Sequence, residues 1–396
     1  MITRLPDGIE ISSAALPWTA TYDTSRCSGP APVVFHGTPL IHRIRSSLDS
    51  WHEDAAAASR CRARRRGRAA QVRTACSLPI GVDVAIAHTH DYSAHAVRLI
   101  TDVTIPPAME LKQGVAVDSL SLPPSYTAWR ELTRAGTLGP WQAIPTEGLT
   151  WDHHPLAIIL QRDDGVELEI GVGVDIWRWQ AGFAGAASNR GRYELRPSTA
   201  GFDLLRYPTL CVEPLAPEAR DYRFSSYLAW RDPATPASAP ASADIDGAIE
   251  VPWRGPGDLD RNALADALDR RPDAPLLFDL AHVPRPEAWE RSSDTALCLS
   301  YRKVMSRLKR ALRQFNELPL AGRTIHVDNL YPGCCDADKH LNQRRPTPHW
   351  DLTGILQFAL WARQCLGPDV TLQNTIPPQL DLPSLHHLFA DGGHDR

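Results

Sequence analysis

Alternating apolar and polar positions mark several segments in the first part of the chain. Ala96–Ile105 alternates and ends at Pro106-Pro107, and Val166–Gln180 alternates almost without a break. A period of two is typical of a β-strand with one buried face. Tyr222–Trp230 is rich in aromatic residues and is a further predicted strand.

The turn Asp163-Asp164-Gly165 precedes Val166, and Ala157–Gln161 precedes the turn. This order predicts a β-hairpin. Many short strands interrupted by Gly and Pro are typical of an antiparallel arrangement. We therefore predict an antiparallel β-sandwich or barrel-like domain over residues 1–232.

The last part of the chain alternates between predicted helices and strands. Thr295–Phe315 has apolar positions at helical spacing and a basic outer face. Pro348–Cys365 is a predicted helix, with Thr347 as its cap and Pro348 at its first position. The other predicted elements are a helix over Leu259–Leu268 and strands over Pro275–Ala281, Arg323–Leu330 and Val370–Ile376.

This order predicts a smaller α/β domain over residues 250–396, and a mixed α+β fold class for the whole chain. The residues just past the predicted strands are Asp279, His282, Asp328 and Asn374. If the strands are parallel, these residues share the sheet edge where ligands usually bind.

A Pro/Ala/Ser tract, PATPASAPASA, lies over residues 233–243. It has no charge and no large apolar side chain, so it cannot bury enough surface to offset its ordering entropy. We predict a linker over residues 233–249 between the two domains.

The composition narrows the class of protein. The 396 residues are 43% hydrophobic and 22% charged, with a net charge of -4, so nothing in the overall charge favours nucleic acid or an anionic membrane as a partner. The 34 prolines exceed the roughly 20 expected at average usage. No segment reaches the roughly 20 apolar residues of a membrane helix, and the first residues do not form a secretory signal, which predicts a cytoplasmic location.

One segment is strongly basic. Ala55–Arg73 carries seven arginines and no aromatic residue that could stack on a base. We interpret it as a solvated helix or an inserted loop in preference to a phosphate- or RNA-binding patch.

The segment from His326 to Asp351 holds three histidines, two adjacent cysteines and four aspartates. His326 and Asp328 lie two apart on a predicted strand and face the same side, which suits two metal ligands or a base with its carboxylate. The two cysteines follow Gly333 at a predicted helix start, where the thiol pKa would be lowered. The candidate catalytic residues are Asp328, Cys334, Cys335, Asp336 and His340, and the candidate metal ligands are His326, Asp328 and His340.

An alternative interpretation gives residues of this segment a structural role and no catalytic role. Asp336 and Asp351 would stabilise helix N-termini, and His349 would pack in a first helical turn. No dinucleotide or Walker motif is present, so nucleotide-dependent chemistry is not indicated. The sequence leaves the cofactor undecided, with a divalent metal as a candidate.

A second histidine-rich segment spans residues 87–95. His88 and His90 form an H-x-H pair, which on a strand can hold zinc. A complete H-x-H-x-D-H metallohydrolase pattern is absent, because Asp91 directly follows His90. We therefore interpret these histidines, with His95, as residues of a surface or hairpin.

Two functions remain open, and the sequence leaves undecided whether the chain is an enzyme. The first is a cytoplasmic hydrolytic enzyme, metal-dependent in one variant, with a site at His326–Asp351 and a small molecule or carbohydrate as substrate. The alternative is a non-catalytic binding or assembly module. In it a tryptophan face formed by Trp177 and Trp179, together with the basic helix Thr295–Phe315, contacts a protein partner.

Overall fold

The computed structural model of the chain is built mainly from antiparallel β-sheets. It describes residues 1–13, 17–26, 29–48, 51–52, 60–66, 69–79, 83–92, 96–107, 115–133, 137–151, 153, 155–172, 192–208, 220–233, 247–255, 257–280, 282–283, 297, 299, 302–315, 317–320, 322–328, 334–335, 349–350, 358, 362, 366, 370–374 and 382–383.

The chain divides into two compact units. The first contains residues 1–132 and 139–232, and the second contains residues 133–138 and 233–396. The predicted β-rich, mostly antiparallel character is confirmed. The predicted domain limits and the linker over 233–249 stay a prediction, because residues 234–246 lie outside the described part of the chain.

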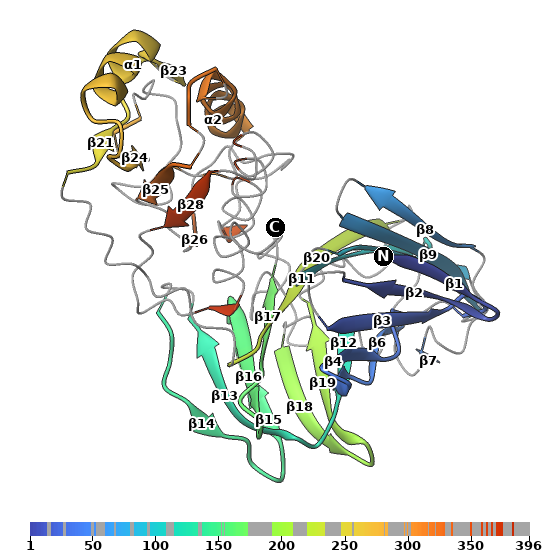
Figure 1. The fold of residues 1–396 in the computed structure, drawn as a ribbon. Coiled ribbons are helices and arrows are strands. Elements are labelled where there is room, and N and C mark those ends of the chain that lie inside the picture. Colours follow the sequence, from blue (N-terminus) through green and yellow to red (C-terminus); the bar gives the residue numbers. More distant parts are fainter. Residues whose placement is uncertain are drawn as a thin grey trace. The chain divides into compact units, whose positions relative to one another are not determined.

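Within its described residues, the first unit contains three antiparallel sheets (Figure 1). The five-stranded sheet has the order β1 (Ile2–Leu5), β2 (Gly8–Ser12), β3 (Trp18–Asp23), β4 (Val33–Phe35) and β5 (Thr38–Ile41). The nine-stranded sheet has the order β14 (Gln142–Ala143), β13 (Tyr126–Leu132), β16 (Ala157–Arg162), β17 (Glu167–Val172), β20 (Arg220–Arg231), β11 (Ala96–Ile105), β10 (Asp83–Tyr92), β9 (Ala69–Pro79) and β8 (Arg60–Arg66). The six-stranded sheet has the order β15 (Leu149–Trp151), β18 (Arg192–Ser198), β19 (Gly201–Tyr207), β12 (Val115–Leu122), β6 (Arg43–Leu48) and β7 (Trp51–His52).

Aromatic side chains join these sheets. Trp18 of β3 stacks on Tyr92 of β10 with ring centroids 5.5 Å apart, and it meets Trp230 of β20 edge-on at 5.4 Å. Trp129 of β13 meets Trp151 of β15 edge-on at 5.1 Å. These contacts pack the five-stranded and six-stranded sheets against the nine-stranded sheet, because rings of this size bury large apolar areas.

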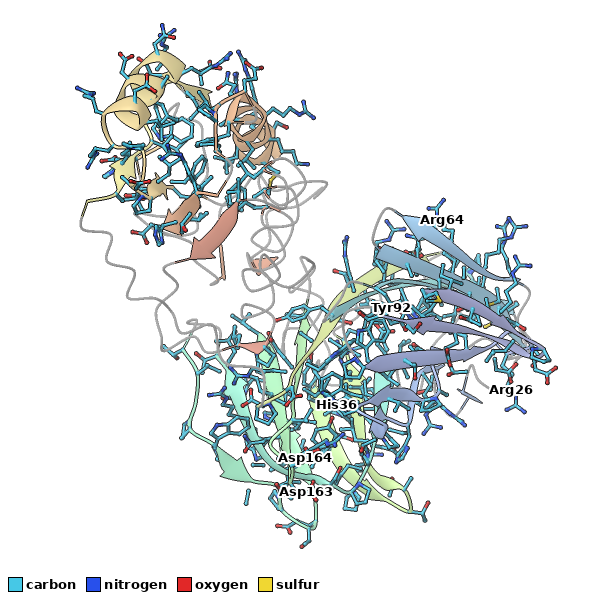
Figure 2. All side chains as sticks on the ribbon, in the orientation of Figure 1. Arg26, His36, Arg64, Tyr92, Asp163 and Asp164 are labelled. Carbon is cyan, nitrogen blue, oxygen red and sulfur yellow. The ribbon has the colours of Figure 1, made fainter. Side chains whose placement is uncertain are left out.

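The strands predicted from the period-two pattern are confirmed, but β17 is buried on both faces, because Glu167 pairs with Arg231 and Glu169 accepts a hydrogen bond from Tyr227. Strand β11 has the predicted bounds, and its side chains alternate between buried and more exposed positions. The predicted hairpin is confirmed as β16 and β17, which pair antiparallel across the turn that contains Asp163 and Asp164 (Figure 2). The end of the predicted strand, residues 173–180, lies outside the described residues.

The interpretation of the arginine-rich segment is wrong for the residues described there. Residues 60–66 form β8, which pairs antiparallel with β9 at the edge of the nine-stranded sheet. The side chains of Arg60, Arg62 and Arg64 are exposed, and Cys61 and Ala63 between them are half-buried (Figure 2 labels Arg64). The segment is therefore a period-two edge strand. Its charges oppose pairing with a strand of another molecule.

The second unit contains a parallel sheet whose spatial order follows the chain. Its strands are β21 (Ile249–Glu250), β24 (Leu276–Asp279), β25 (Thr324–Asp328) and β28 (Thr371–Asn374), and each neighbouring pair is parallel. Helix α1 (Arg261–Arg270) lies between β21 and β24 in the chain, and α2 (Arg302–Phe315) lies between β24 and β25. Short antiparallel pairs complete the described strands: β22 (Trp253–Gly255) with β23 (Asp258–Leu259), and β26 (Cys334–Cys335) with β27 (His349–Trp350).

Both helices form for local reasons. The Asp260 carboxylate caps α1 by accepting a hydrogen bond from the Ala263 N–H at 3.2 Å, and Leu264 and Leu268 are buried one turn apart. Helix α2 buries Val304, Met305, Leu308, Ala311, Leu312 and Phe315. Neither of these helices is both long and apolar enough to span a membrane.

Two helix starts were predicted incorrectly. Helix α2 begins at Arg302, not at Thr295, since Leu297 forms a β-bridge and Leu299 lies in a turn. The second helix does not begin at Pro348, because His349 and Trp350 form strand β27. Capping residues alone do not fix a helix start where strand pairing competes for the backbone.

Candidate functional site

The carboxyl edge of the parallel sheet brings together two aspartates from adjacent strands. Asp279 ends β24, Asp328 ends β25, and the two are Cα partners in the register. Neighbouring strands lie about 4.8 Å apart, so the two side chains leave the backbone at the same level on the same face. Asp279 is 7% exposed and Asp328 is half-buried. The predicted convergence of these strand ends is confirmed.

His282 connects Asp279 to a third acidic residue. Its Nδ1 lies 3.2 Å from Asp279 Oδ2 and 2.5 Å from Glu250 Oε1. Its backbone N–H donates to the Asp279 carbonyl at 3.2 Å, which fixes the turn after β24. The side chains of His282 and Glu250 are 58% and 55% exposed, so a dissolved substrate can reach them.

His326 lies one residue pair below this edge. It pairs with Leu277 and, by strand alternation, faces the same side as Asp328. The side chain is 4% exposed, burial lowers its pKa, and its Nδ1 has no hydrogen-bond partner among the described residues. The prediction that His326 and Asp328 lie on one face of a strand therefore agrees with the observed strand β25.

The opposite face of this sheet is apolar. The Phe278 ring contacts Trp253 at 5.3 Å, Phe315 at 5.7 Å and Phe358 at 6.1 Å. Parallel strands usually carry apolar residues on both faces. The polar residues at the carboxyl end of the other face are therefore unexplained by core packing, and such residues often mark a site.

The predicted cysteine site has a different local structure. Cys334 and Cys335 form β26, pairing with Trp350 and His349 of β27. They do not begin a helix, so the proposed lowering of a thiol pKa by a helix end has no support. Asp336 and His340 lie outside the described residues, as do His95, Trp177 and Trp179.

The first unit holds a second cluster of ionisable side chains. His88, His90 and Asp118 each offer one possible ligand atom, and these atoms lie within 4.8 Å of one another. The residues are 3%, 1% and 0% exposed. The interpretation of His88 and His90 as hairpin residues agrees with β10, which pairs antiparallel with the next strand, β11, but a surface location is wrong because both side chains are buried. The H-x-H pattern was visible in the sequence, but nothing in it pointed to Asp118 or, at the sheet edge, to Glu250.

Comparison with known proteins gives no family. No family model matches the chain, and no curated protein matches it. Among solved structures, it is similar to the GH36 α-galactosidase AgaA of Geobacillus stearothermophilus, with 9% identity, a TM-score of 0.40, and coverage of 92% of this chain and 72% of that one.

Two further solved structures each match more than half of the chain's length. The Slr1438 protein of Synechocystis sp. PCC 6803 has 7% identity, a TM-score of 0.40, and coverage of 57% of this chain and 96% of that one. A galactose mutarotase related enzyme of Lactobacillus acidophilus has 6% identity, a TM-score of 0.33, and coverage of 56% and 97%. Two of these three proteins have names of carbohydrate-active enzymes. Their TM-scores of 0.40 and 0.33 are too low to support a statement about the fold or function of this chain.

Proposed function

We propose that the chain is a cytoplasmic hydrolytic enzyme whose site lies at the carboxyl edge of the parallel sheet. The observation that supports this best is the register that sets Asp279 beside Asp328, with His282 held by Asp279 and Glu250. Carboxylates and an imidazole at hydrogen-bond distance are the groups that move protons in hydrolysis.

Each residue has a distinct role in this proposal. Asp328, the more exposed of the two aspartates, activates water or attacks the substrate. His282 passes a proton to the leaving group, because it is exposed and its Nδ1 is already oriented by carboxylates. Asp279 and Glu250 are positioning residues that fix the imidazole ring.

The proposed substrate is a small molecule, and carbohydrates are the first class to test. Glycoside hydrolysis uses one group as nucleophile or base and a second group as acid. In this proposal Asp328 takes the first role and His282 the second.

The test is a panel of p-nitrophenyl glycosides, esters and phosphates offered to wild type, Asp328→Asn and Asp273→Asn. Asp273 is an exposed residue that precedes the amino end of β24, opposite to the end that carries Asp279, and serves as the matched control. We expect Asp328→Asn to lower the rate by about 10²–10⁴-fold, and the control to stay near wild type. Folded wild type that hydrolyses no substrate class, or an Asp328→Asn variant with full activity, would contradict the proposal.

The metal-dependent variant of this function uses His326, Asp328 and His340 as ligands. The covalent variant uses Cys334 or Cys335 as nucleophile, with Asp336 and His340 as acid/base residues. The metal-dependent variant is excluded if metal-free protein is folded and fully active. The covalent variant is excluded if Cys334 and Cys335 react with a thiol reagent no faster than Cys76, which is buried and free.

The binding-module alternative has one supporting observation. Helix α2 exposes Lys303, Arg307, Arg310 and Arg313 along its outer face. A protein partner retained by wild type and lost when Arg307 and Arg313 are changed to Glu, in a chain with no hydrolytic activity, would favour this alternative.

A further inference from the structure

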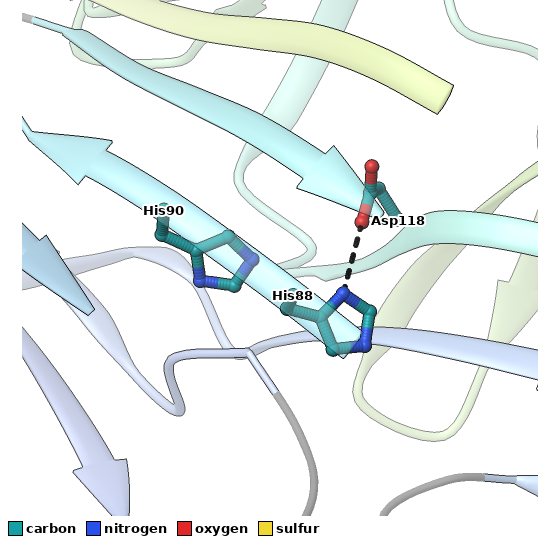
Figure 3. Close-up of side chains that lie close together, drawn as sticks. All are labelled: His88, His90 and Asp118. Atoms are coloured by element: carbon teal, nitrogen blue, oxygen red, sulfur yellow. Dashed lines mark ion pairs between the residues drawn. The ribbon is translucent and has the colours of Figure 1, made fainter. Parts of the chain in front are cut away.

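The buried cluster of the first unit has the residues of a metal site. His88 and His90 lie two apart on β10 and share the inner face of the nine-stranded sheet. Asp118 comes from β12 of the six-stranded sheet, and its Oδ1 lies 3.8 Å from His88 Nδ1 (Figure 3). Two imidazoles and one carboxylate form the ligand set of many three-ligand zinc sites.

The backbone of β12 is distorted at the carboxylate ligand. Asp118 has φ +47°, in the left-handed region, and the pairing of β12 with β6 shifts register between Ala116 and Ser119. Such a bulge re-aims a side chain, and a strained non-glycine residue of this kind is common at functional sites. The Asp118 N–H donates to Ser46 Oγ at 3.1 Å, which holds the bulge.

The histidine His90 is oriented by its neighbours. Its Nδ1 lies 2.8 Å from the Tyr22 hydroxyl, which in turn lies 2.6 Å from the Tyr92 hydroxyl. If Nδ1–H donates to Tyr22 and Tyr22 donates to Tyr92, the lone pair of His90 is on Nε2. That buried Nε2 atom has no hydrogen-bond partner among the described residues. Metal-bound histidines typically donate their other ring N–H to such an oxygen.

Hydroxyl groups orient the carboxylate in the same way. Thr101 Oγ1 donates to Asp118 Oδ1 at 2.7 Å, and Ser226 Oγ donates to Asp118 Oδ2 at 3.3 Å. His88 Nδ1 lies 2.8 Å from Thr101 Oγ1, so the same hydroxyl touches both ligand atoms. The buried Arg206 donates to the main-chain oxygen of Asp118 at 3.4 Å.

The burial of the cluster suits a cation. The Asp118 carboxylate is fully buried, at 0% exposed. A carboxylate that is fully buried is stabilised by a cation at its oxygen.

We propose that His88 Nδ1, His90 Nε2 and Asp118 Oδ1 bind one zinc ion, which ties the nine-stranded sheet to the six-stranded sheet. Binding requires the His88 tautomer with its proton on Nε2 and its lone pair on Nδ1, and Thr101 keeps its bond to Asp118. A water or Thr101 Oγ1 completes the four ligands that zinc prefers. This inference does not depend on the proposed hydrolytic site, whose residues all belong to the second unit.

The test is metal analysis of the full chain, purified without a histidine tag or chelating resin from medium that contains zinc. We expect about one zinc per chain in wild type. The Asp118→Asn variant should lose most of it, because asparagine tolerates the left-handed backbone but is a weak ligand. The control His153→Ala removes an exposed histidine of the same unit and should keep the zinc.

A second set of measurements uses wild type and therefore tests the proposal even if the variants do not fold. Wild type stripped with a chelator should unfold at a lower temperature and recover on addition of Zn²⁺. Replacement by Co²⁺ should give the visible absorption of a tetrahedral site, absent from Asp118→Asn. Folded wild type that carries no metal, is not stabilised by Zn²⁺ and gives no Co²⁺ spectrum would show the cluster to be a hydrogen-bonded network and overturn the proposal.

Discussion

The sheet edge of the second unit and the buried cluster of the first use similar side chains in opposite surroundings. At the sheet edge, the His282 and Glu250 side chains are more than half exposed. In the cluster, His88, His90 and Asp118 are at most 3% exposed. An exposed histidine–carboxylate group can meet a substrate, whereas a buried one can contribute only through stability or a bound ion.

The two regions also differ in how the backbone positions the residues. The sheet edge needs only parallel strands that end at the same level, as β24 and β25 do. The cluster needs mid-strand residues of β10 and β12 to meet across two sheets, with a bulge at Asp118. The comparison predicts that substitutions in the cluster reduce stability and that substitutions at the edge reduce activity.

The largest expected effect is on stability at Asp118. Asp118→Ala removes the carboxylate that accepts hydrogen bonds from the buried Thr101 and Ser226 hydroxyls, which should cost about 3 kcal/mol. Asp279→Ala at the sheet edge should cost about 1 kcal/mol. Urea unfolding of both variants measures the difference, and equal costs would contradict the comparison.

The next effect concerns the hydroxyl of Tyr22. Tyr22→Phe leaves both His90 Nδ1 and the Tyr92 hydroxyl without this partner and should cost about 2 kcal/mol. Tyr126→Phe is the matched control, since the Tyr126 hydroxyl makes one buried bond, to the Leu40 carbonyl at 3.0 Å. We expect about 1 kcal/mol there. A control that costs as much as Tyr22→Phe would mean that the cluster network adds nothing.

A smaller stability effect is expected at His282. His282→Gln removes an exposed ion pair, which is worth about 0.5 kcal/mol at most. Hydrolytic activity should fall by at least about tenfold, because the proposed proton donor is lost. Thermal unfolding and rate measurements on the same preparation separate the two. A variant with unchanged rate would exclude His282 from the chemistry.

The smallest effect is a pH dependence from His326. Burial lowers its folded-state pKa below the unfolded value near 6.5, so the unfolded chain binds the proton more readily. The contribution of His326 to stability is therefore full above pH 6.5 and is lost as the pH falls toward the folded-state pKa. Comparing the unfolding midpoints of wild type and His326→Gln between about pH 7 and pH 5 checks the sign. A wild-type midpoint that rises on acidification relative to the variant would contradict it.

Local pattern predicted the elements of both regions but only one of the two sites. The order of helices and strands was enough to place Asp279, His282 and Asp328 at one edge, because parallel strands share a direction. It could not place Asp118 beside His88, because that contact depends on a bulge and on pairing between distant strands. The H-x-H pattern is visible in the sequence, but it does not show whether His88 and His90 are buried, because their burial depends on the same packing of distant strands.

Competition between structures explains the other errors. The alternating exposure of Arg60–Arg64 is a strand signal, yet the high charge suggested a solvated helix. Cys334 and His349 lie in paired strands in place of the predicted helix starts. In each case pairing with another strand determines the local structure. The periodicity of one segment does not show which strand it pairs with.

The most direct test of the division between the two regions is the turnover of one substrate by Asp328→Asn and Asp118→Asn, measured side by side where both are folded. We expect the rate of Asp328→Asn to fall at least about a hundredfold, and that of Asp118→Asn to stay within a few-fold of wild type. The reverse pattern, with Asp118→Asn inactive and Asp328→Asn active, would place the chemistry in the buried cluster and contradict the proposed site.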